Sequence, residues 1–154
     1  MYLTRYGDRP RVDQDQHDKV IQMVKKKEWE NLVNVEKVET NPDGETNRSA
    51  GQVRKGERIE DQYPDIVAIS AKTHRPGIIG EIETEQSINE NEAEQWSDYA
   101  ILGINFYLYV PATKKDEAFQ ILVQKDLYKK IRSLRTYKVA NESVDIGTVF
   151  ENKS

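Results

Sequence analysis

Two apolar runs, DIVAIS at residues 65–70 and GIIGEIET at residues 77–84, decide the fold that this sequence predicts. Both runs are short and rich in isoleucine and valine, which is typical of β-strands. The connection between them is only a few residues long, so the two strands can lie side by side as a hairpin. In such a hairpin Asp65, which begins the first run, would lie beside Glu81 or Glu83 of the second.

The sequence around this hairpin predicts helices on both sides and further strands. Apolar residues at helical spacing, with aspartates early and lysines late, predict a helix from about residue 13 to residue 29. The remaining elements expected are strands over 32–39 and 104–110, helices over 91–102 and 114–132, and short strands near 135–140 and 147–150. The run 104–110 is almost wholly apolar and fits a strand that is covered on both faces. This order predicts an α/β fold in which helices flank a mixed sheet.

The chain of 154 residues is expected to form one domain with one hydrophobic core. Residues 1–12 are polar and contain a glycine and a proline, which indicates a loose N-terminal arm. Residues 41–62 begin with the turn sequence Asn-Pro-Asp-Gly and continue as a polar stretch. We interpret them as a long polar loop, which is either mobile or acts when a partner binds.

The composition excludes several kinds of site. The chain has no cysteine, which excludes disulfides and thiolate metal sites, and its two histidines argue against a histidine-rich zinc site. Any metal ion would then be held mainly by oxygen, which favours magnesium, manganese or calcium. No apolar run approaches the roughly 18 residues of a membrane helix, and the N-terminus lacks a signal-peptide core. We therefore expect a cytoplasmic protein that does not enter a membrane.

The segment GEIETEQ, residues 80–86, places Glu81, Glu83 and Glu85 at alternate positions. Because side chains alternate along a strand, all three would share one face. The simpler interpretation is a solvated acidic face. However, no Lys or Arg occurs between residues 81 and 100, and crowded carboxylates repel one another unless a cation joins them. Together with Asp65, these glutamates therefore form a candidate magnesium site.

The dipeptide Pro64-Asp65, separated by fifteen residues from Glu81-Ile82-Glu83, resembles the signature of the PD-(D/E)XK nuclease superfamily. The resemblance implies a restriction-endonuclease-like core with the order αβββαβ, which matches the predicted elements. It also implies that Asp65 and Glu81 bind the metal ion and that Ile82 contributes its backbone carbonyl oxygen. The last position of the motif is usually lysine, and here it is Glu83; some restriction enzymes of this superfamily carry glutamate there and still cleave.

The next predicted helix carries Gln95 and Tyr99, which resemble the QxxxY motif of RecB-like members. This spacing puts both side chains on one helix face, and the resemblance implies that they lie near the metal and the bound strand. Taken alone, Tyr99 would be interpreted as a packing residue and Gln95 as a surface residue. In many members a carboxylate of the first helix also points at the metal. Asp18, with Asp15 behind it, is the candidate here, and the alternative is an acidic side chain favoured by the helix dipole.

These features predict a metal-dependent nuclease that hydrolyses phosphodiester bonds in DNA with Mg²⁺ or Mn²⁺ as cofactor. Glu83 would help to hold the metal or act as the base for the attacking water. Because a carboxylate cannot supply the charge of lysine, another group would have to stabilise the transition state. Lys72 and Arg75 on the adjoining connection could reach the site, and the alternative is that both are ordinary solvent-facing charges. A homodimer is expected by analogy, since one site cuts one strand. The alternatives are an inactive nuclease fold that binds nucleic acid or protein, and an unrelated α/β domain whose acidic surface binds a protein partner.

Basic side chains that could contact nucleic-acid phosphates occur in the polar loop, in the hairpin connection and near the end of the last predicted helix. Residues 111–140 contain eight Lys or Arg and three Asp or Glu, in a chain of formal net charge −4. Such a local basic strip can bind phosphates despite net acidity, although the solvated face of a helix is the ordinary alternative. No base-reading motif is present, so binding through the backbone is expected. The candidates are Arg54, Lys55, Arg58, Lys72, Arg75, Lys129, Lys130 and Arg132.

Overall fold

The computed structural model describes residues 11–153 of the chain. The predicted arm at residues 1–12 therefore lies almost wholly outside the described residues, and the first helix already begins at Arg11. The helical elements are α1 (Arg11–Val24), the π-helical turn η1 (Lys25–Trp29), α2 (Glu90–Ile101), the 3-10 turn η2 (Ala112–Lys114) and α3 (Lys115–Gln124). The strands are β1 (Val35–Thr40), β2 (Gly51–Lys55), β3 (Arg58–Gln62), β4 (Ile66–Ser70), β5 (Pro76–Ile82), β6 (Asn105–Pro111), β7 (Ser133–Ala140) and β8 (Ser143–Glu151).

Six of these strands form one mixed sheet in the order β1-β4-β5-β6-β7-β8. The pairs β1–β4, β4–β5 and β7–β8 are antiparallel, whereas β5–β6 and β6–β7 are parallel. The chain crosses from β5 to β6 through α2 and from β6 to β7 through α3, as parallel neighbours require. The predicted hairpin is the pair β4–β5, and the predicted α/β fold with a mixed sheet between helices is confirmed.

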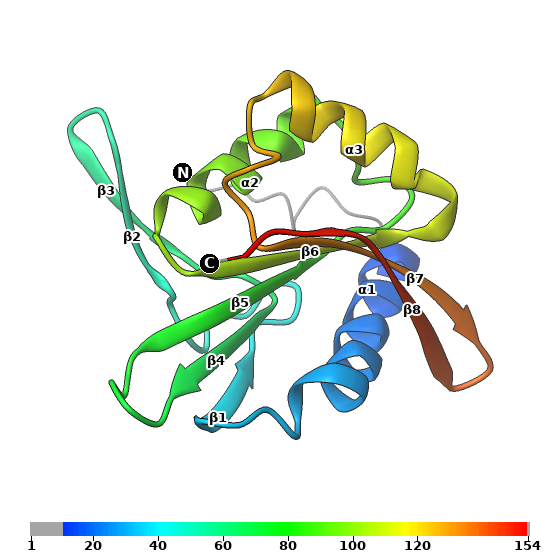
Figure 1. The fold of residues 1–154 in the computed structure, drawn as a ribbon, viewed down its shortest axis with the longest axis horizontal. Coiled ribbons are helices and arrows are strands. Elements are labelled where there is room, and N and C mark those ends of the chain that lie inside the picture. The colour runs from blue at the N-terminus through cyan, green and yellow to red at the C-terminus, as the bar shows by residue number, and fades with distance from the viewer. Residues whose placement is uncertain (1–10, 154) are drawn as a thin grey trace.

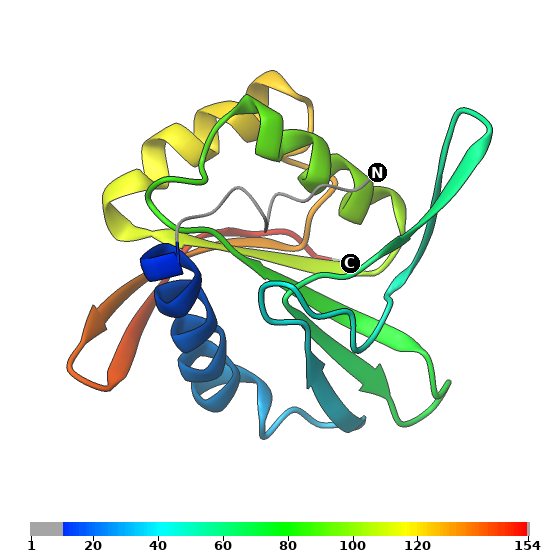
Figure 2. The same ribbon diagram turned by 180° about the vertical axis from the view of Figure 1, so that it is seen from behind.

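Helices cover both faces of the sheet (Figures 1 and 2): α1 lies on one face, and α2 and α3 lie on the other. The alternation of side chains along the strands divides the core in the same way. In β4, Val67 and Ile69 join the core beneath α2 and α3, whereas Ile66 and Ala68 join the core beneath α1. The strand β6 likewise contributes to both cores, as its nearly continuous apolar sequence predicts.

The strand β5 passes close to the tryptophan that ends η1. A Cβ atom built on Gly80 would lie 2.8 Å from Cζ2 of Trp29, which is closer than carbon atoms pack. The indole N–H of Trp29 donates to the hydroxyl of Tyr109 at 3.1 Å. Glycine at position 80 therefore lets a large buried ring lie directly against the strand, one residue before Glu81.

The prediction of a long polar loop over residues 41–62 is wrong for its second half. The strands β2 and β3 pair as an antiparallel hairpin that stands apart from the six-stranded sheet (Figure 1). Gly56, with a φ of 65°, occupies the first position of the two-residue turn, where glycine is favoured. Most side chains of this hairpin are exposed, so the alternation of apolar and polar residues that marks a half-buried strand is weak here.

The helix predicted over residues 114–132 ends earlier, at Gln124. Asp126 adopts a left-handed conformation with a φ of 56°, and the N–H of Leu127 donates to the carbonyl of Leu122 at 2.8 Å. This is the Schellman arrangement, which ends helices. Leu127 packs in the same core as Leu122. The apolar spacing therefore continues past the end of α3, and for this reason the sequence predicts a helix that is too long.

Candidate metal centre

The start of β4 and the end of β5 bring two buried carboxylates together. The backbone N–H of Asp65 donates to Oε1 of Glu81 at 3.2 Å. In return, Oδ2 of Asp65 accepts the backbone N–H of Ile82 at 2.7 Å. Both side chains are fully buried. The antiparallel hairpin thus places Asp65 beside Glu81, as the sequence led us to expect.

Glu83 follows the end of β5 and is also fully buried. Its Oε2 accepts the indole N–H of Trp96 at 2.7 Å, and its Oε1 accepts the hydroxyl of Ser87 at 2.6 Å. Its backbone carbonyl accepts the hydroxyl of Tyr137 at 2.6 Å. Donors from α2, from the loop before α2 and from β7 therefore fix Glu83, both in its side chain and in its backbone.

The three glutamates of GEIETEQ do not form one solvated face. Glu81 and Glu83 point into the protein, whereas Glu85 is exposed and accepts the hydroxyl of Thr113 at 2.7 Å. A fourth glutamate, Glu92 in the first turn of α2, joins the buried pair. One oxygen atom from each of Glu81, Glu83 and Glu92 lies within 4.8 Å of the others, which is close enough to hold a metal ion.

His17 of α1 approaches the same place from the other face of the sheet. Its Nε2 lies 3.0 Å from Oδ2 of Asp65 and 2.9 Å from the carbonyl oxygen of Ile82. The imidazole is fully buried. His17 was missed by the sequence reasoning, which chose the neighbouring Asp18. A signal was present, because His17 lies three, four and seven residues before the apolar residues of the buried helix stripe, at 20, 21 and 24.

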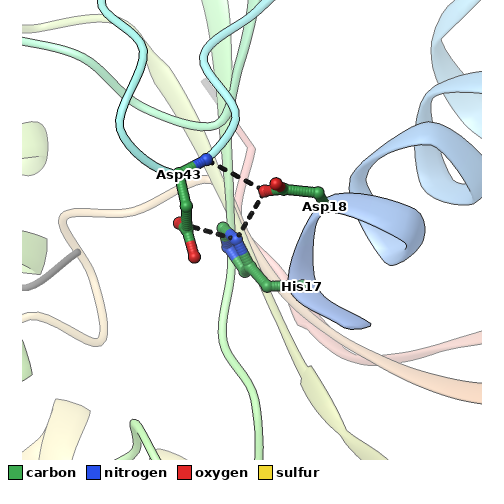
Figure 3. Close-up of side chains that lie close together, drawn as sticks. All are labelled: His17, Asp18 and Asp43. Atoms are coloured by element: carbon green, nitrogen blue, oxygen red, sulfur yellow. Dashed lines mark hydrogen bonds and ion pairs between the residues drawn. The ribbon is translucent and has the colours of Figure 1, made fainter. Parts of the chain in front are cut away.

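The opposite ring nitrogen of His17 faces two aspartates (Figure 3). Nδ1 lies 2.9 Å from Oδ1 of Asp43 and 3.4 Å from Oδ1 of Asp18. Burial by itself would lower the pKa of the imidazole, but the surrounding carboxylates, with Asp65 foremost, outweigh it and raise that pKa well above its ordinary value. His17 thus links two groups of acidic side chains, one on each ring nitrogen.

The other predicted site residues occupy different positions. Gln95 lies on α2 and donates from Nε2 to Oε1 of Gln62 at 3.0 Å. Tyr99 is buried and packs edge-on against Phe106 at a ring distance of 5.5 Å, and it also lines a cavity with Gln95. Asp18 contacts His17 on the Nδ1 side of the ring, whereas Asp65 lies on the Nε2 side.

The predicted basic contacts are not brought together around the carboxylates. The β4–β5 turn lies at the end of the hairpin opposite to Asp65, and β7 begins at that same far edge because it runs parallel to β5 and β6. In the β2–β3 hairpin, Nζ of Lys55 lies 2.7 Å from Oδ1 of Asp98. The far edge carries Lys72, Arg75, Lys129, Lys130 and Arg132, and the β2–β3 hairpin carries Arg54, Lys55 and Arg58.

Two cavities are lined by residues that lie near members of the cluster in the sequence. One, of about 750 Å³, is lined by Thr84, Glu85 and residues of α1 and β7. The other, of about 620 Å³, lies between the β2–β3 hairpin and α2 and is lined by Gln62, Tyr63 and Gln95 among others. Thr84, the residue after Glu83, lines the first opening, and Tyr63, two residues before Asp65, lines the second.

Two groups of side chains lie close enough together to hold a metal ion: Glu81, Glu83 and Glu92, and His17, Asp18 and Asp43. Asp65 and Glu81 offer carboxylate oxygens, Ile82 offers a carbonyl oxygen and His17 offers a ring nitrogen, all from side chains or backbone that the fold holds in place. Such oxygen-rich sites suit magnesium and manganese. Comparisons of this chain with protein-family models, with curated proteins and with solved structures found no match. Within residues 11–153, no helix is long and apolar enough to cross a bilayer.

Proposed function

We propose that this chain is a metal-dependent nuclease that hydrolyses phosphodiester bonds, with DNA as its substrate. One observation carries the proposal: the Asp65 carboxylate, the Ile82 carbonyl and the His17 imidazole converge within 3.0 Å contacts, and Glu81 is hydrogen-bonded to the same aspartate. These groups come from α1, from the start of β4 and from the end of β5. The resemblance of residues 64–83 to the PD-(D/E)XK signature supports the same assignment.

The donor set argues for Mn²⁺ at least as strongly as for Mg²⁺. Carboxylate and carbonyl oxygens suit either ion, whereas imidazole is a ligand for transition metals. Asp65, Glu81, Ile82 and His17 would hold the ion, and Glu92 lies close to one member of this set, Glu81. A divalent cation at this position would supply an acidified water and neutralise charge on the scissile phosphate.

In this proposal Glu83 helps to position the other acidic side chains of the cluster. Both of its carboxylate oxygens accept hydrogen bonds, from Trp96 and from Ser87, and these bonds fix the orientation of the carboxylate. We therefore assign it to holding the acidic cluster in shape rather than to activating the water. Thr84 and Glu85, which follow it, line the larger cavity, and we propose that a strand of nucleic acid would approach the centre from there.

A second function is favoured by the absence of the motif lysine. Position 83 is glutamate, and the basic residues proposed to replace the lysine charge, Lys72 and Arg75, lie at the far end of the β4–β5 hairpin. A nuclease fold without that charge could still hold a cation and bind nucleic acid or protein without cleaving. If cleavage of duplex DNA does occur, a homodimer would supply the second site that the opposite strand requires.

The test compares two glutamates of the same strand segment. Glu81→Gln removes a buried carboxylate charge from the centre, and Glu85→Gln makes the identical chemical change at an exposed position. Titration calorimetry with Mn²⁺ and Mg²⁺ is expected to show binding in the wild type and in Glu85→Gln, and loss of binding in Glu81→Gln. Cleavage of duplex, single-stranded and branched DNA, with RNA in parallel, should follow the same pattern. Equal metal binding and equal cleavage by both variants would overturn the proposal, and binding without cleavage by the wild type would favour the inactive fold.

A further inference from the structure

We propose that Asp43 is a positioning residue of the metal centre: its carboxylate accepts the Nδ1 proton of His17 and thereby presents Nε2 to the cation. This inference rests on the proposed function, because it assumes that His17 is a ligand. Asp43 lies in the turn Asn-Pro-Asp-Gly, 26 residues after His17 and 22 residues before Asp65.

The contact is short and enclosed. Nδ1 of His17 lies 2.9 Å from Oδ1 of Asp43, and the two side chains are 0% and 1% exposed (Figure 3). On the opposite side of the ring, Nε2 faces Asp65 and the Ile82 carbonyl at 3.0 and 2.9 Å. Nδ1 of the imidazole is therefore paired with a buried carboxylate, and Nε2 lies against two oxygen acceptors that are candidate metal ligands.

The turn that carries Asp43 is tied to the strand that carries Asp65. The side-chain amide of Asn41 donates to the carbonyl of Pro64 at 2.7 Å, and its backbone N–H donates to the carbonyl of Asp65 at 3.0 Å. The backbone N–H of Asp43 in turn donates to Oδ1 of Asp18 at 2.9 Å. The acceptor for Nδ1 and the carboxylate beside Nε2 thus belong to one hydrogen-bonded unit.

This arrangement has a chemical purpose at a metal site. A neutral imidazole binds a cation through one nitrogen only if the other nitrogen carries the proton, and a hydrogen bond to a carboxylate fixes that tautomer and the ring orientation. Removing such an outer partner typically lowers metal affinity about 10- to 100-fold. Asp43 suits the part better than Asp18, since Asp18 lies farther from Nδ1, at 3.4 Å, and its side chain is 36% exposed.

The experiment uses two substitutions at Asp43 and one matched control. Asp43→Ala removes the acceptor, and Asp43→Asn keeps an uncharged oxygen in nearly the same shape. Asp145→Asn makes the same change of charge at an exposed position of the β7–β8 hairpin. Circular dichroism establishes that each variant is folded, and if Asp43→Ala is not, Asp43→Asn decides the question. Mn²⁺ affinity is measured by titration calorimetry.

A second readout follows the ring itself. The chain contains only two histidines, His17 and His74, and His74 is exposed, so long-range ¹H–¹⁵N NMR resolves two imidazoles. With Zn²⁺, whose complexes leave these signals sharp, we expect the wild type to carry its His17 proton on Nδ1 and none on Nε2.

Three results would support the inference and two would oppose it. The supporting results are a loss of Mn²⁺ affinity of about 10- to 100-fold in Asp43→Ala, a smaller loss in Asp43→Asn, and faster solvent exchange of the Nδ1 proton in both variants. If the Asp43 variants bind Mn²⁺ as tightly as Asp145→Asn, with an unchanged His17 spectrum, the positioning role is wrong while the proposed function stands. If the wild type binds no metal, the proposed function itself fails, and this inference fails with it.

Discussion

Trp96→Phe should destabilise the protein more than Trp29→Phe, although both replace a buried indole by a phenyl ring. Trp96 is 0% exposed and donates its indole N–H to the carboxylate of Glu83 at 2.7 Å. Trp29 is 2% exposed and donates to a neutral partner, the hydroxyl of Tyr109, at 3.1 Å. The two substitutions therefore remove similar apolar volume but different hydrogen bonds.

The magnitudes follow from the two acceptors. A hydrogen bond to a charged group contributes about 1.5–3 kcal/mol, whereas a neutral one contributes about 0.5–1.5 kcal/mol. The lost ring atoms add about 1–2 kcal/mol in each variant. We therefore expect Trp96→Phe to lower the free energy of unfolding by about 2.5–5 kcal/mol and Trp29→Phe by about 1.5–3.5 kcal/mol, a difference of about 1 kcal/mol or slightly more. For a chain of this length, the difference corresponds to about 2–6 °C in Tm.

The assay is urea unfolding followed by circular dichroism, which does not depend on the tryptophan signals that the variants remove. Glu83→Gln and the double variant Trp96→Phe/Glu83→Gln complete a double-mutant cycle. Because the two side chains are in contact, the cycle should show a coupling above about 0.5 kcal/mol, the limit for independent sites. Additive effects, or an equal cost for both tryptophans, would refute the claim that the indole of Trp96 holds a charged carboxylate in place.

Three further outcomes are expected. Gly80→Ala should lower the free energy of unfolding in urea by about 1–3 kcal/mol, because its methyl group would overlap the buried indole of Trp29 at 2.8 Å. Gly77→Ala should change this free energy little, since its Cβ would make an ordinary contact at 3.5 Å. Equal losses in the two variants would contradict the packing. His17→Ala should lower Mn²⁺ affinity at least about 10-fold and Mg²⁺ affinity by a smaller factor, because imidazole favours the transition metal. The control His74→Ala should change neither affinity. An equal loss of affinity for both ions in His17→Ala would argue against a nitrogen ligand. Asn41→Ala should cost about 2–4 kcal/mol in thermal or urea unfolding, since a fully buried amide loses three hydrogen bonds to backbone groups, and a cost below about 0.5 kcal/mol would show that the loop is held by other means.

The fold could be predicted where local pattern and tertiary environment agree. The runs at 65–70 and 104–110 are apolar because both faces of the central strands are covered, and they match β4 and β6 to within one residue. The β2–β3 hairpin was missed because neither of its faces is buried against the sheet, so it has no apolar alternation to detect. The end of α3 was missed because Leu127 returns to the same core after the helix has ended.

Only the part of the candidate site that a single hairpin assembles could be predicted from the sequence. Asp65 and Glu81 follow from one hairpin, so their meeting needs no knowledge of the rest of the chain. His17 and Glu92 come from helices on opposite faces of the sheet, and no local pattern states how those helices are placed. For Glu92 a weak signal existed, because it lies three and four residues before Gln95 and Trp96 on one helix face.

The direction of the strands explains why these ligands meet at one edge of the sheet. Because β4 and β5 are antiparallel, β4 begins where β5 ends, and that edge therefore receives Asp65 and Glu81 together. Because β5 and β6 are parallel, the crossover through α2 must also start at this edge, which brings the first turn of α2, capped by Asn89, to the same place. The positive end of that helix dipole offsets part of the repulsion among the buried carboxylates, which for two charges 4 Å apart is about 4 kcal/mol at an effective dielectric of 20. A divalent cation bound among these carboxylates would offset more of this repulsion than the helix dipole does.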